Sequence, residues 1–197
     1  MCATTEVSDA IRIQFLDTHN VRRNVLATGQ MTDAYGPMAL PTASNMLKLR
    51  WDCALEKEAI DYINTCPMST YAKKNDQESG ENFFRSPMSS YPAPRDAVKK
   101  AITEWWKVYR MYSTPGTNAM FLSAHLNSPV ASYTMMGWAI NQYLGCAIGI
   151  CGTDYVAVCR YNRMRPNTIN YPQYTVGAPC SACPAGTSCI SGMGLCN

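Results

Sequence analysis

Cysteine is the residue type with the most evident chemistry in this chain, which contains ten. Four of them cluster near the C-terminus, as Cys180, Cys183, Cys189 and Cys196. Cys180-x-x-Cys183 has the spacing of half a zinc site, but the segment contains no second Cys-x-x-Cys and no histidine. An even cysteine count suits disulfides, and a short segment with few apolar residues needs cross-links to hold a shape. We therefore predict full disulfide pairing, no free thiol and an oxidising compartment.

The sequence lacks several of the residues that catalysis would require. The chain contains two histidines, His19 and His125, so a serine nucleophile has few bases available, and no Gly-x-Ser-x-Gly turn occurs. A cysteine nucleophile needs a free thiol, which full pairing excludes. A glycosidase-like carboxylate pair would need Glu81 and Glu104 to face each other across a cleft. We predict that the protein is not an enzyme.

Composition indicates a globular protein, with 47% apolar and 16% charged residues. No window approaches the roughly 18 consecutive apolar residues of a membrane span, so no transmembrane segment is expected. The net charge is +3 and the basic residues form no stripe, which argues against nucleic acid as a partner. The start of the chain has no apolar stretch after a basic segment, so any secretion signal is expected to be already removed.

Helical periodicity dominates the first half of the sequence. Apolar residues at helical spacing follow the capping candidate Ser8 and stop at Gly29. A second helical pattern runs from Leu49 to Ile63 and Pro67. Residues 69–90 are polar and predicted to be irregular, and a third, aromatic helix covers Val98 to Tyr112.

Short apolar segments dominate the second half. Residues 133–139, 143–150 and 154–161 are β-rich or compact, with Gly145 and Gly152 near the expected turns. Helices followed by hairpin strands predict an α+β fold with an antiparallel sheet.

Five motifs, in order, resemble the SCP/TAPS (CAP) superfamily. They are Phe15-Leu16-Asp17-Thr18-His19-Asn20-Val21-Arg22-Arg23, Gly80-Glu81-Asn82-Phe83, Tyr133-Thr134-Met135-Met136-Gly137-Trp138, Gly145-Cys146-Ala147-Ile148-Gly149-Ile150-Cys151 and Val158-Cys159-Arg160-Tyr161-Asn162. Residues 49–56 and the ending Gly194-Leu195-Cys196 are similar to nematode activation-associated secreted proteins, also called venom-allergen-like proteins. The resemblance implies a three-layer α-β-α sandwich over residues 1–165 and a cysteine-rich, hinge-like extension over residues 166–197.

The same resemblance implies a disulfide map, which spacing alone does not select. It pairs Cys66 with Cys151, Cys146 with Cys159, Cys180 with Cys189 and Cys183 with Cys196. Cys2 and Cys53 are then left for each other.

Superfamily members have a central cavity with two His and two Glu, a set that binds a divalent metal in some of them and could support hydrolysis. In this chain, the corresponding positions hold Thr70, Glu81, Val108 and Ser132. Glu104 would replace Val108 if the helix were read four residues out of step. One retained carboxylate gives too few ligands for a tight metal site, so we expect no metal and no cofactor. Glu81 is expected to bind backbone amides or hydroxyls.

The two histidines are given structural interpretations. The His-Asn-x-x-Arg pattern of His19, Asn20 and Arg23 resembles a structural motif of the superfamily, with the ring hydrogen-bonded inside the sandwich. His125 is expected at the surface or at an interface.

The resemblance implies a secreted, extracellular, non-enzymatic nematode effector that acts at the host–parasite interface, by immune modulation or by binding a host protein, with a homodimer as a candidate state. The alternative is an extracellular sterol- or lipid-binding protein, and a metal-dependent hydrolase is less favoured. Methionine suits adaptable apolar surfaces, so a patch around Met111, Met120 and Phe121 is the first candidate for a dimer or ligand surface.

Overall fold

The central sheet has the strand order β1-β4-β5-β2. The computed structural model describes residues 1–32, 39–70, 80–161 and 166–197. The strands are β1 (Arg50–Trp51), β2 (Glu81–Pro87), β4 (Tyr143–Cys151) and β5 (Asp154–Tyr161), and β3 (Met120–Phe121) pairs separately with β6 (Tyr171–Pro172). The helices are α1 (Asp9–Ala27), α2 (Cys53–Ile63), α3 (Pro94–Lys107), α4 (Ser123–Leu126) and α5 (Val130–Met136), with short 3-10 turns at Met88–Ser90, Val108–Arg110 and Gly116–Asn118. Among the described helices, none is long and apolar enough to cross a membrane.

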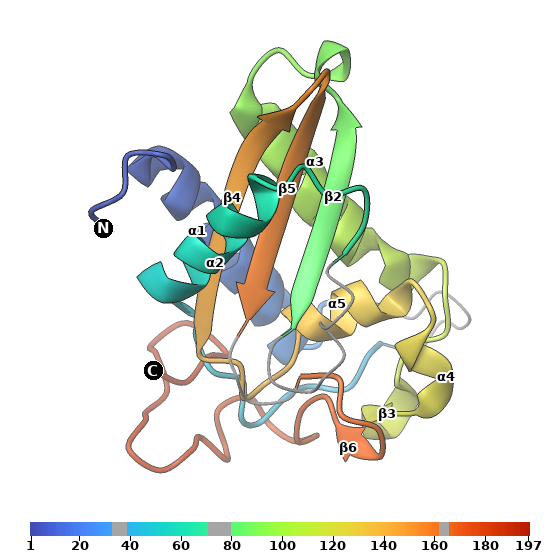
Figure 1. Ribbon diagram of the computed structural model, residues 1–197. Coiled ribbons are helices and arrows are strands. Elements are labelled where there is room, and N and C mark those ends of the chain that lie inside the picture. Colours follow the sequence, from blue (N-terminus) through green and yellow to red (C-terminus); the bar gives the residue numbers. More distant parts are fainter. Residues whose placement is uncertain (33–38, 71–79, 162–165) are drawn as a thin grey trace.

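Side-chain alternation along β4 and β5 creates two cores, one on each face of the sheet. Cys146, Cys159 and Tyr161 contribute to the larger core, which also contains buried residues of α1, α3 and α5. Val156 and Val158 face the other way and pack with apolar residues of α2. Since successive side chains of a strand point to opposite faces, one sheet supports both helical layers. Figure 1 shows α2 in front of the sheet and α1 and α3 behind it. The predicted α-β-α sandwich is confirmed.

The sheet is antiparallel at β2, β5 and β4, as expected, whereas the short β1 runs parallel to β4. β1 occupies a position that the sequence analysis assigned to the beginning of a helix. Leu49 is buried before β1, and α2 begins only at Cys53, after Asp52 accepts hydrogen bonds from the backbone amides of Ala54 and Leu55. The N-cap thus sets the start of this helix.

Two other elements differ from the sequence-based expectation. β2 lies within residues 69–90, which were predicted to be irregular, and its partner β5 supplies the backbone hydrogen bonds that define it as a strand. The segment from residue 133 to 136 is part of helix α5, where Tyr133 packs edge-on against Trp106 of α3 with ring centroids 5.0 Å apart. Tertiary contacts decide both elements.

The structure pairs the ten cysteines as the resemblance implied, and no described cysteine is free. Cys2–Cys53 ties the N-terminal segment to the start of α2. Cys66–Cys151 joins the segment after α2 to the end of β4, and Cys146–Cys159 is a cross-strand pair inside the larger core. Cys180–Cys189 and Cys183–Cys196 lie in the extension.

The C-terminal extension lies against the sandwich. The backbone amide of Cys196 donates to Met46 O, and the amide of Lys48 donates to Cys196 O, both at 2.8 Å. Leu195 is 1% exposed and belongs to the larger core. Residues 166–197 therefore share apolar packing with the rest of the chain, and the division after residue 165 stays a prediction.

Candidate functional site

A cleft of about 680 Å³ lies where β2 begins and α3 ends. Every position that the sequence predicted for the cavity lines this cleft. Thr70, Glu81, Val108 and Ser132 all line it. Glu104, the alternative to Val108, lines it as well, because residues four apart share one face of the helical segment that ends α3. The remaining lining is Asn82, Phe83, Phe84, Trp105, Leu126, Asn127, Ser128, Pro129, Ala131, Met135, Pro166, Asn167, Thr168 and Ile169.

Glu81 is engaged in an ion pair that the sequence analysis did not consider. Its Oε2 lies 3.1 Å from Nη2 and 3.2 Å from Nε of Arg160, on the neighbouring strand β5. The same guanidinium lies 3.1 Å from Oε2 of Glu58 and over the ring of Tyr62, both on α2. Glu81 is 3% exposed, so its carboxylate joins sheet and helix through Arg160.

Glu104 is held between two lysines of its own helical segment. Its carboxylate oxygens lie 2.7 Å from Nζ of Lys100 and 2.6 Å from Nζ of Lys107. Burial raises the pKa of the Glu104 carboxyl, but hydrogen bonds and attraction from the two ammonium groups outweigh this and hold it below its ordinary value. A glycosidase acid needs a raised pKa, so Glu104 is unsuited to that role.

Ser132 is held by acceptors that cannot activate it. Its hydroxyl lies 2.9 Å from the backbone oxygens of both Trp105 and Pro129. A carbonyl oxygen can receive this hydrogen bond but cannot remove the proton as a general base does. Ser132 therefore joins α5 to α3 in the wall of the cleft.

A buried hydrogen-bonded chain runs from the cleft to α1. Asn82 Nδ2 donates to Ser132 O at 3.1 Å and to the hydroxyl of Tyr161 at 3.0 Å. His19 Nδ1 lies 2.7 Å from Phe15 O and must donate to it, so Nε2 accepts from the Tyr161 hydroxyl at 3.0 Å. Burial lowers the pKa of His19 to about 3 and raises the pKa of Tyr161. His19 is therefore neutral, and its predicted structural role is confirmed.

The rest of the His-Asn-x-x-Arg pattern holds backbone segments in place. The Asn20 side chain pairs with both the amide and the carbonyl of Leu49, at 2.8 and 3.0 Å. Arg23 is fully buried and donates to five carbonyl oxygens, those of Leu47, Met136, Trp138, Ala139 and Asn141. Burial lowers the pKa of Arg23 to about 9. These contacts join α1 to the segment before β1 and to the end of α5 and the segment that leads from it into β4.

His125 was expected at the surface or at an interface, but it does not lie at the surface. The residue is 7% exposed, and its Nδ1 accepts a hydrogen bond from the amide of Leu122 at 2.9 Å. Its ring lies 5.4 Å from that of Phe121, and burial lowers its pKa. His125 does not line the cleft, so neither histidine can serve there as base or ligand.

The expected methionine patch does not form as one apolar surface. Met111 is 54% exposed, but Met120 is half-buried in β3 and Phe121 is fully buried beneath it. A second hollow, of about 500 Å³, lies elsewhere, beside β6. It is lined by Asn45, Trp138, Ala139, Ile140, Thr168, Tyr171, Pro172, Gln173, Tyr174 and Thr175.

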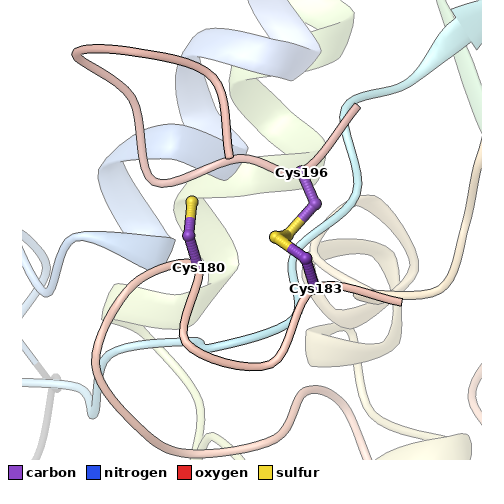
Figure 2. Close-up of side chains that lie close together, drawn as sticks. All are labelled: Cys180, Cys183 and Cys196. Carbon is purple, nitrogen blue, oxygen red and sulfur yellow. A yellow bond between two sulfur atoms is a disulfide. The ribbon is translucent and has the colours of Figure 1, made fainter. Parts of the chain in front are cut away.

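Within the described part of the chain, one group has the spacing of metal ligands: Cys180, Cys183 and Cys196, whose sulfur atoms all lie within 4.8 Å of one another. Figure 2 shows the bond between Cys183 and Cys196, and Cys180 is bonded to Cys189. Zinc is bound by cysteine thiolates, whereas the sulfur atoms of these cysteines already form disulfide bonds. The extension therefore has disulfides in place of the zinc site considered as a rival.

Sequence reasoning missed two side chains that shape the cleft. Trp105 Nε1 donates to Phe83 O at 2.9 Å, which fixes the helix against β2. Asn167, at φ 58°, bonds to the hydroxyl of Thr134 and to Ala131 O, and so closes the other wall. Asparagine tolerates this left-handed backbone conformation. The sequence contains no signal that residues as far apart along the chain as Asn167 and Glu81 line the same cleft.

Comparisons with known proteins agree with this geometry. The model of the cysteine-rich secretory protein family, CAP, matches residues 16–161. Ancylostoma secreted protein of Ancylostoma caninum is 32% identical over 99% of this chain and 46% of its own length. A cysteine-rich venom protein of Tityus serrulatus is 27% identical over 97% of this chain and 47% of its own. The chain thus spans about half the length of these two curated relatives.

Solved structures show the same architecture. A crystal structure of Na-ASP-1 has a TM-score of 0.88 at 31% identity, over 99% of this chain and 49% of that one. A crystal structure of NaASP2 with Zn2+ has a TM-score of 0.89 at 28% identity and covers both chains fully. The structure of BmVAL-1 has a TM-score of 0.89 at 25% identity, over 100% of this chain and 98% of that one. With the family model matched across the sandwich and these relatives alike over its full length, the chain belongs to the CAP family.

Proposed function

We propose that this chain is a secreted nematode protein that binds a host protein through the mouth of the cleft and carries out no catalysis. The observation that carries the proposal is the engagement of each polar group that hydrolysis could use. Glu81 pairs with Arg160, Glu104 pairs with two lysines, and Ser132 donates to carbonyl oxygens. What the cleft offers to a partner is a preformed, mixed polar and aromatic surface, which is typical of recognition sites.

Secretion is supported by the cysteines and by the relatives. Disulfides persist in oxidising compartments, and the structure holds five, two of them in the short extension. The relatives include proteins named for secretion and for venom. A host-facing role is consistent with both observations.

Zinc does not fit the described residues of this cleft. NaASP2 has been crystallised with Zn2+, so the question belongs to this fold. Here His19 and His125 are both hydrogen-bonded outside the cleft, and the Glu81 carboxylate already faces a guanidinium. Tight sites for zinc usually need several nitrogen, sulfur or carboxylate ligands converging on one point. We therefore propose that recognition by this chain does not depend on a metal.

The proposal is tested by blocking the cleft without disturbing the core. Thr70→Trp would place a bulky ring at the cleft, and Val21→Trp would place the same ring on the exposed face of α1 as a matched control. Host serum and tissue proteins are passed over the oxidised wild type and both variants, and captured proteins are quantified by mass spectrometry. We expect a host protein whose capture falls at least about tenfold with Thr70→Trp alone, a loss of about 1.4 kcal/mol. Equal capture by both variants, or no capture by the wild type, would exclude the cleft as the binding site.

The second candidate function, sterol or lipid binding, is favoured by the hollow beside β6. Trp138, Ile140 and Tyr171 give it a largely apolar lining. Radiolabelled cholesterol and palmitate are suitable probes, with Ile140→Glu as the blocking variant and Ile150→Glu, at an exposed position of β4, as the control. Stoichiometric uptake lost only with Ile140→Glu would favour this function, whereas absence of uptake by the wild type would remove it.

A further inference from the structure

β2 forms one edge of the described sheet, because the strand order places β5 on one side of it and no described strand on the other. Figure 1 shows β2 as the outer arrow beside β5, with α3 running behind it. The first half of β2 also lines the cleft, through Glu81, Asn82, Phe83 and Phe84. An open strand edge therefore continues directly into the proposed binding site.

The pairing of β2 with β5 determines which backbone groups face outward. In an antiparallel pair, opposite residues alternate between exchanging both hydrogen bonds and exchanging none. The amide of Tyr161 donates to Gly80 O at 3.0 Å, and at the other end the amide of Met88 donates to Thr153 O at 2.9 Å. Even-numbered residues of β2 therefore bond to β5, and Phe83 and Arg85 direct their backbone groups away from it.

The outward groups are only partly covered. Phe83 O accepts from the indole of Trp105 at 2.9 Å, which confirms that this carbonyl points away from β5. Among the described residues, none accepts from the amide of Phe83 or bonds to the backbone of Arg85. Pro87, which has no amide hydrogen, ends the strand. The open edge is thus short, and it presents the amide of Phe83 and both backbone groups of Arg85.

We propose that this edge of β2 binds an extended peptide segment of the partner protein by β-strand addition. The inference rests on the proposed function, because it specifies how the host protein is held. An extended peptide backbone can form hydrogen bonds with the alternating main-chain donors and acceptors of a strand edge. Alternate side chains of the added strand then enter adjoining pockets. The lining of the cleft that adjoins this edge includes the apolar side chains of Phe83, Phe84, Trp105 and Val108, so we expect an apolar side chain at alternate positions of the peptide.

A second copy of the chain fits this edge less well than a peptide. In a two-fold pairing of β2 with β2, the indole of Trp105 would occupy the Phe83 carbonyl in both copies. The run of open groups ends at Pro87 and is too short for a long shared ladder. A flexible peptide can leave the edge after a few residues, whereas a folded copy would bring its own α3 against Trp105.

The first test needs no partner. Hydrogen exchange of the oxidised protein is followed residue by residue by NMR. The amides of Asn82 and Phe84 bond to β5 and should exchange at least about tenfold more slowly than those of Phe83 and Arg85, because exchange requires the hydrogen bond to open. Equal protection of all four amides would overturn the assignment of the open edge.

The second test uses a phage-displayed library of linear heptapeptides selected on the wild type, with each selected peptide resynthesised with single N-methyl groups. We expect methylation to weaken binding at least about tenfold at alternate positions and to have little effect at the positions between them, because only every second amide of an added strand faces β2. Binding should also slow exchange of the Phe83 and Arg85 amides.

Trp105→Phe gives an outcome of opposite sign. The variant removes the indole donor and frees Phe83 O, so binding of the selected peptide should tighten by about fivefold, as expected for one added hydrogen bond. Unchanged or weaker binding by a variant that keeps its melting temperature would count against strand addition.

These outcomes separate the inference from the function on which it rests. A host protein that is sensitive to Thr70→Trp, together with peptides that show no period-two response, overturns strand addition and keeps the proposed function. If the wild type captures no host protein and binds no peptide, both the proposed function and strand addition are overturned. Concentration-dependent dimers that mask the Phe83 and Arg85 amides would assign this edge to a second copy instead.

Discussion

At the scale of single residues, one buried group of charged and polar side chains near the N-terminus is held together by mutual hydrogen bonds. Glu56 is fully buried and receives hydrogen bonds from Arg12, Thr4 and the indole of Trp51, all at 2.6–2.7 Å. The Arg12 guanidinium completes the set by bonding to Thr4 and Asp9. Removing one member of such a group leaves the others buried without compensation.

We therefore expect Glu56→Gln to lower the free energy of unfolding by about 3–5 kcal/mol, the usual cost of breaking a buried ion pair. Glu104→Gln is the matched control, because its two lysine partners are largely solvated and such pairs contribute at most about 1 kcal/mol. Urea unfolding at neutral pH measures both. Similar losses in the two variants would contradict the buried network.

His19 makes stability depend on pH. Its pKa is about 3 in the folded protein because of burial, and about 6.5 when unfolded, so the unfolded chain binds one more proton between these values. Stability is therefore complete above about pH 6.5 and falls by about 1.4 kcal/mol per unit as the pH drops toward 3. Urea unfolding of wild type and His19→Gln should show a shallower slope for the variant between about pH 5 and 6.5. Parallel slopes would mean that His19 is not buried neutral.

At the scale of elements, packing distance distinguishes glycines that look alike in sequence. Gly145 was expected near a turn but lies inside β4, where an added Cβ would meet Glu56 N of α2 at 2.2 Å. At Gly149 the added Cβ would meet Ile63 Cγ2, the end of a side chain, at 2.6 Å. Backbone cannot move aside as a methyl group can.

Gly145→Ala should accordingly cost about 3 kcal/mol, at the upper end of overpacking, and Gly149→Ala about 1 kcal/mol. Thermal unfolding followed by circular dichroism compares the two. A larger cost at Gly149 would show that α2 is not seated on the sheet at Gly145.

The elements also show what sequence can predict about this fold. α1 was predicted nearly to its ends, because Ser8 caps it and apolar residues repeat at helical spacing. β2 was missed because its sequence, Glu-Asn-Phe-Phe-Arg-Ser, does not alternate. Its polar residues are buried by partners on β5, such as Arg160 and Tyr161, which no local pattern reveals.

The candidate site, like the fold, could be predicted only in part from the sequence. Motif order brought Thr70, Glu81, Val108 and Ser132 to one cleft, and the structure places them there. The partners that determine their chemistry, such as Arg160 for Glu81 and the Trp105 carbonyl for Ser132, come from other elements and could not be predicted. His125 was expected at the surface or at an interface because its stretch, bounded by Pro129, resembles a loop, yet its ring packs against Phe121 and bonds to the Leu122 amide.

At the scale of the whole molecule, the C-terminal extension contributes to stability through Cys196. This residue is fully buried, bonded to Cys183, and hydrogen-bonded to the backbone on both sides of Leu47. The Cys180–Cys189 bond lies at the surface by comparison, since both residues are partly or fully exposed. The two disulfides should therefore differ in importance.

Replacing Cys183 and Cys196 by alanine should lower the free energy of unfolding by about 3 kcal/mol or more, and replacing Cys180 and Cys189 should cost less. Guanidinium unfolding gives the size of each loss, and limited proteolysis reports whether the extension has detached. An equal loss from the two pairs would show that burial of Cys196 adds nothing.

The two ends of the chain are fastened to one short segment. Cys53 is bonded to Cys2, and a few residues earlier Met46 and Lys48 hold Cys196 by hydrogen bonds. A tension applied between the termini would pass through residues 46–53 and would bypass β2 and β5. The extension would peel away first, at the Met46 and Lys48 hydrogen bonds, and the load would then pass through the Cys183–Cys196 disulfide to the segment that follows β5.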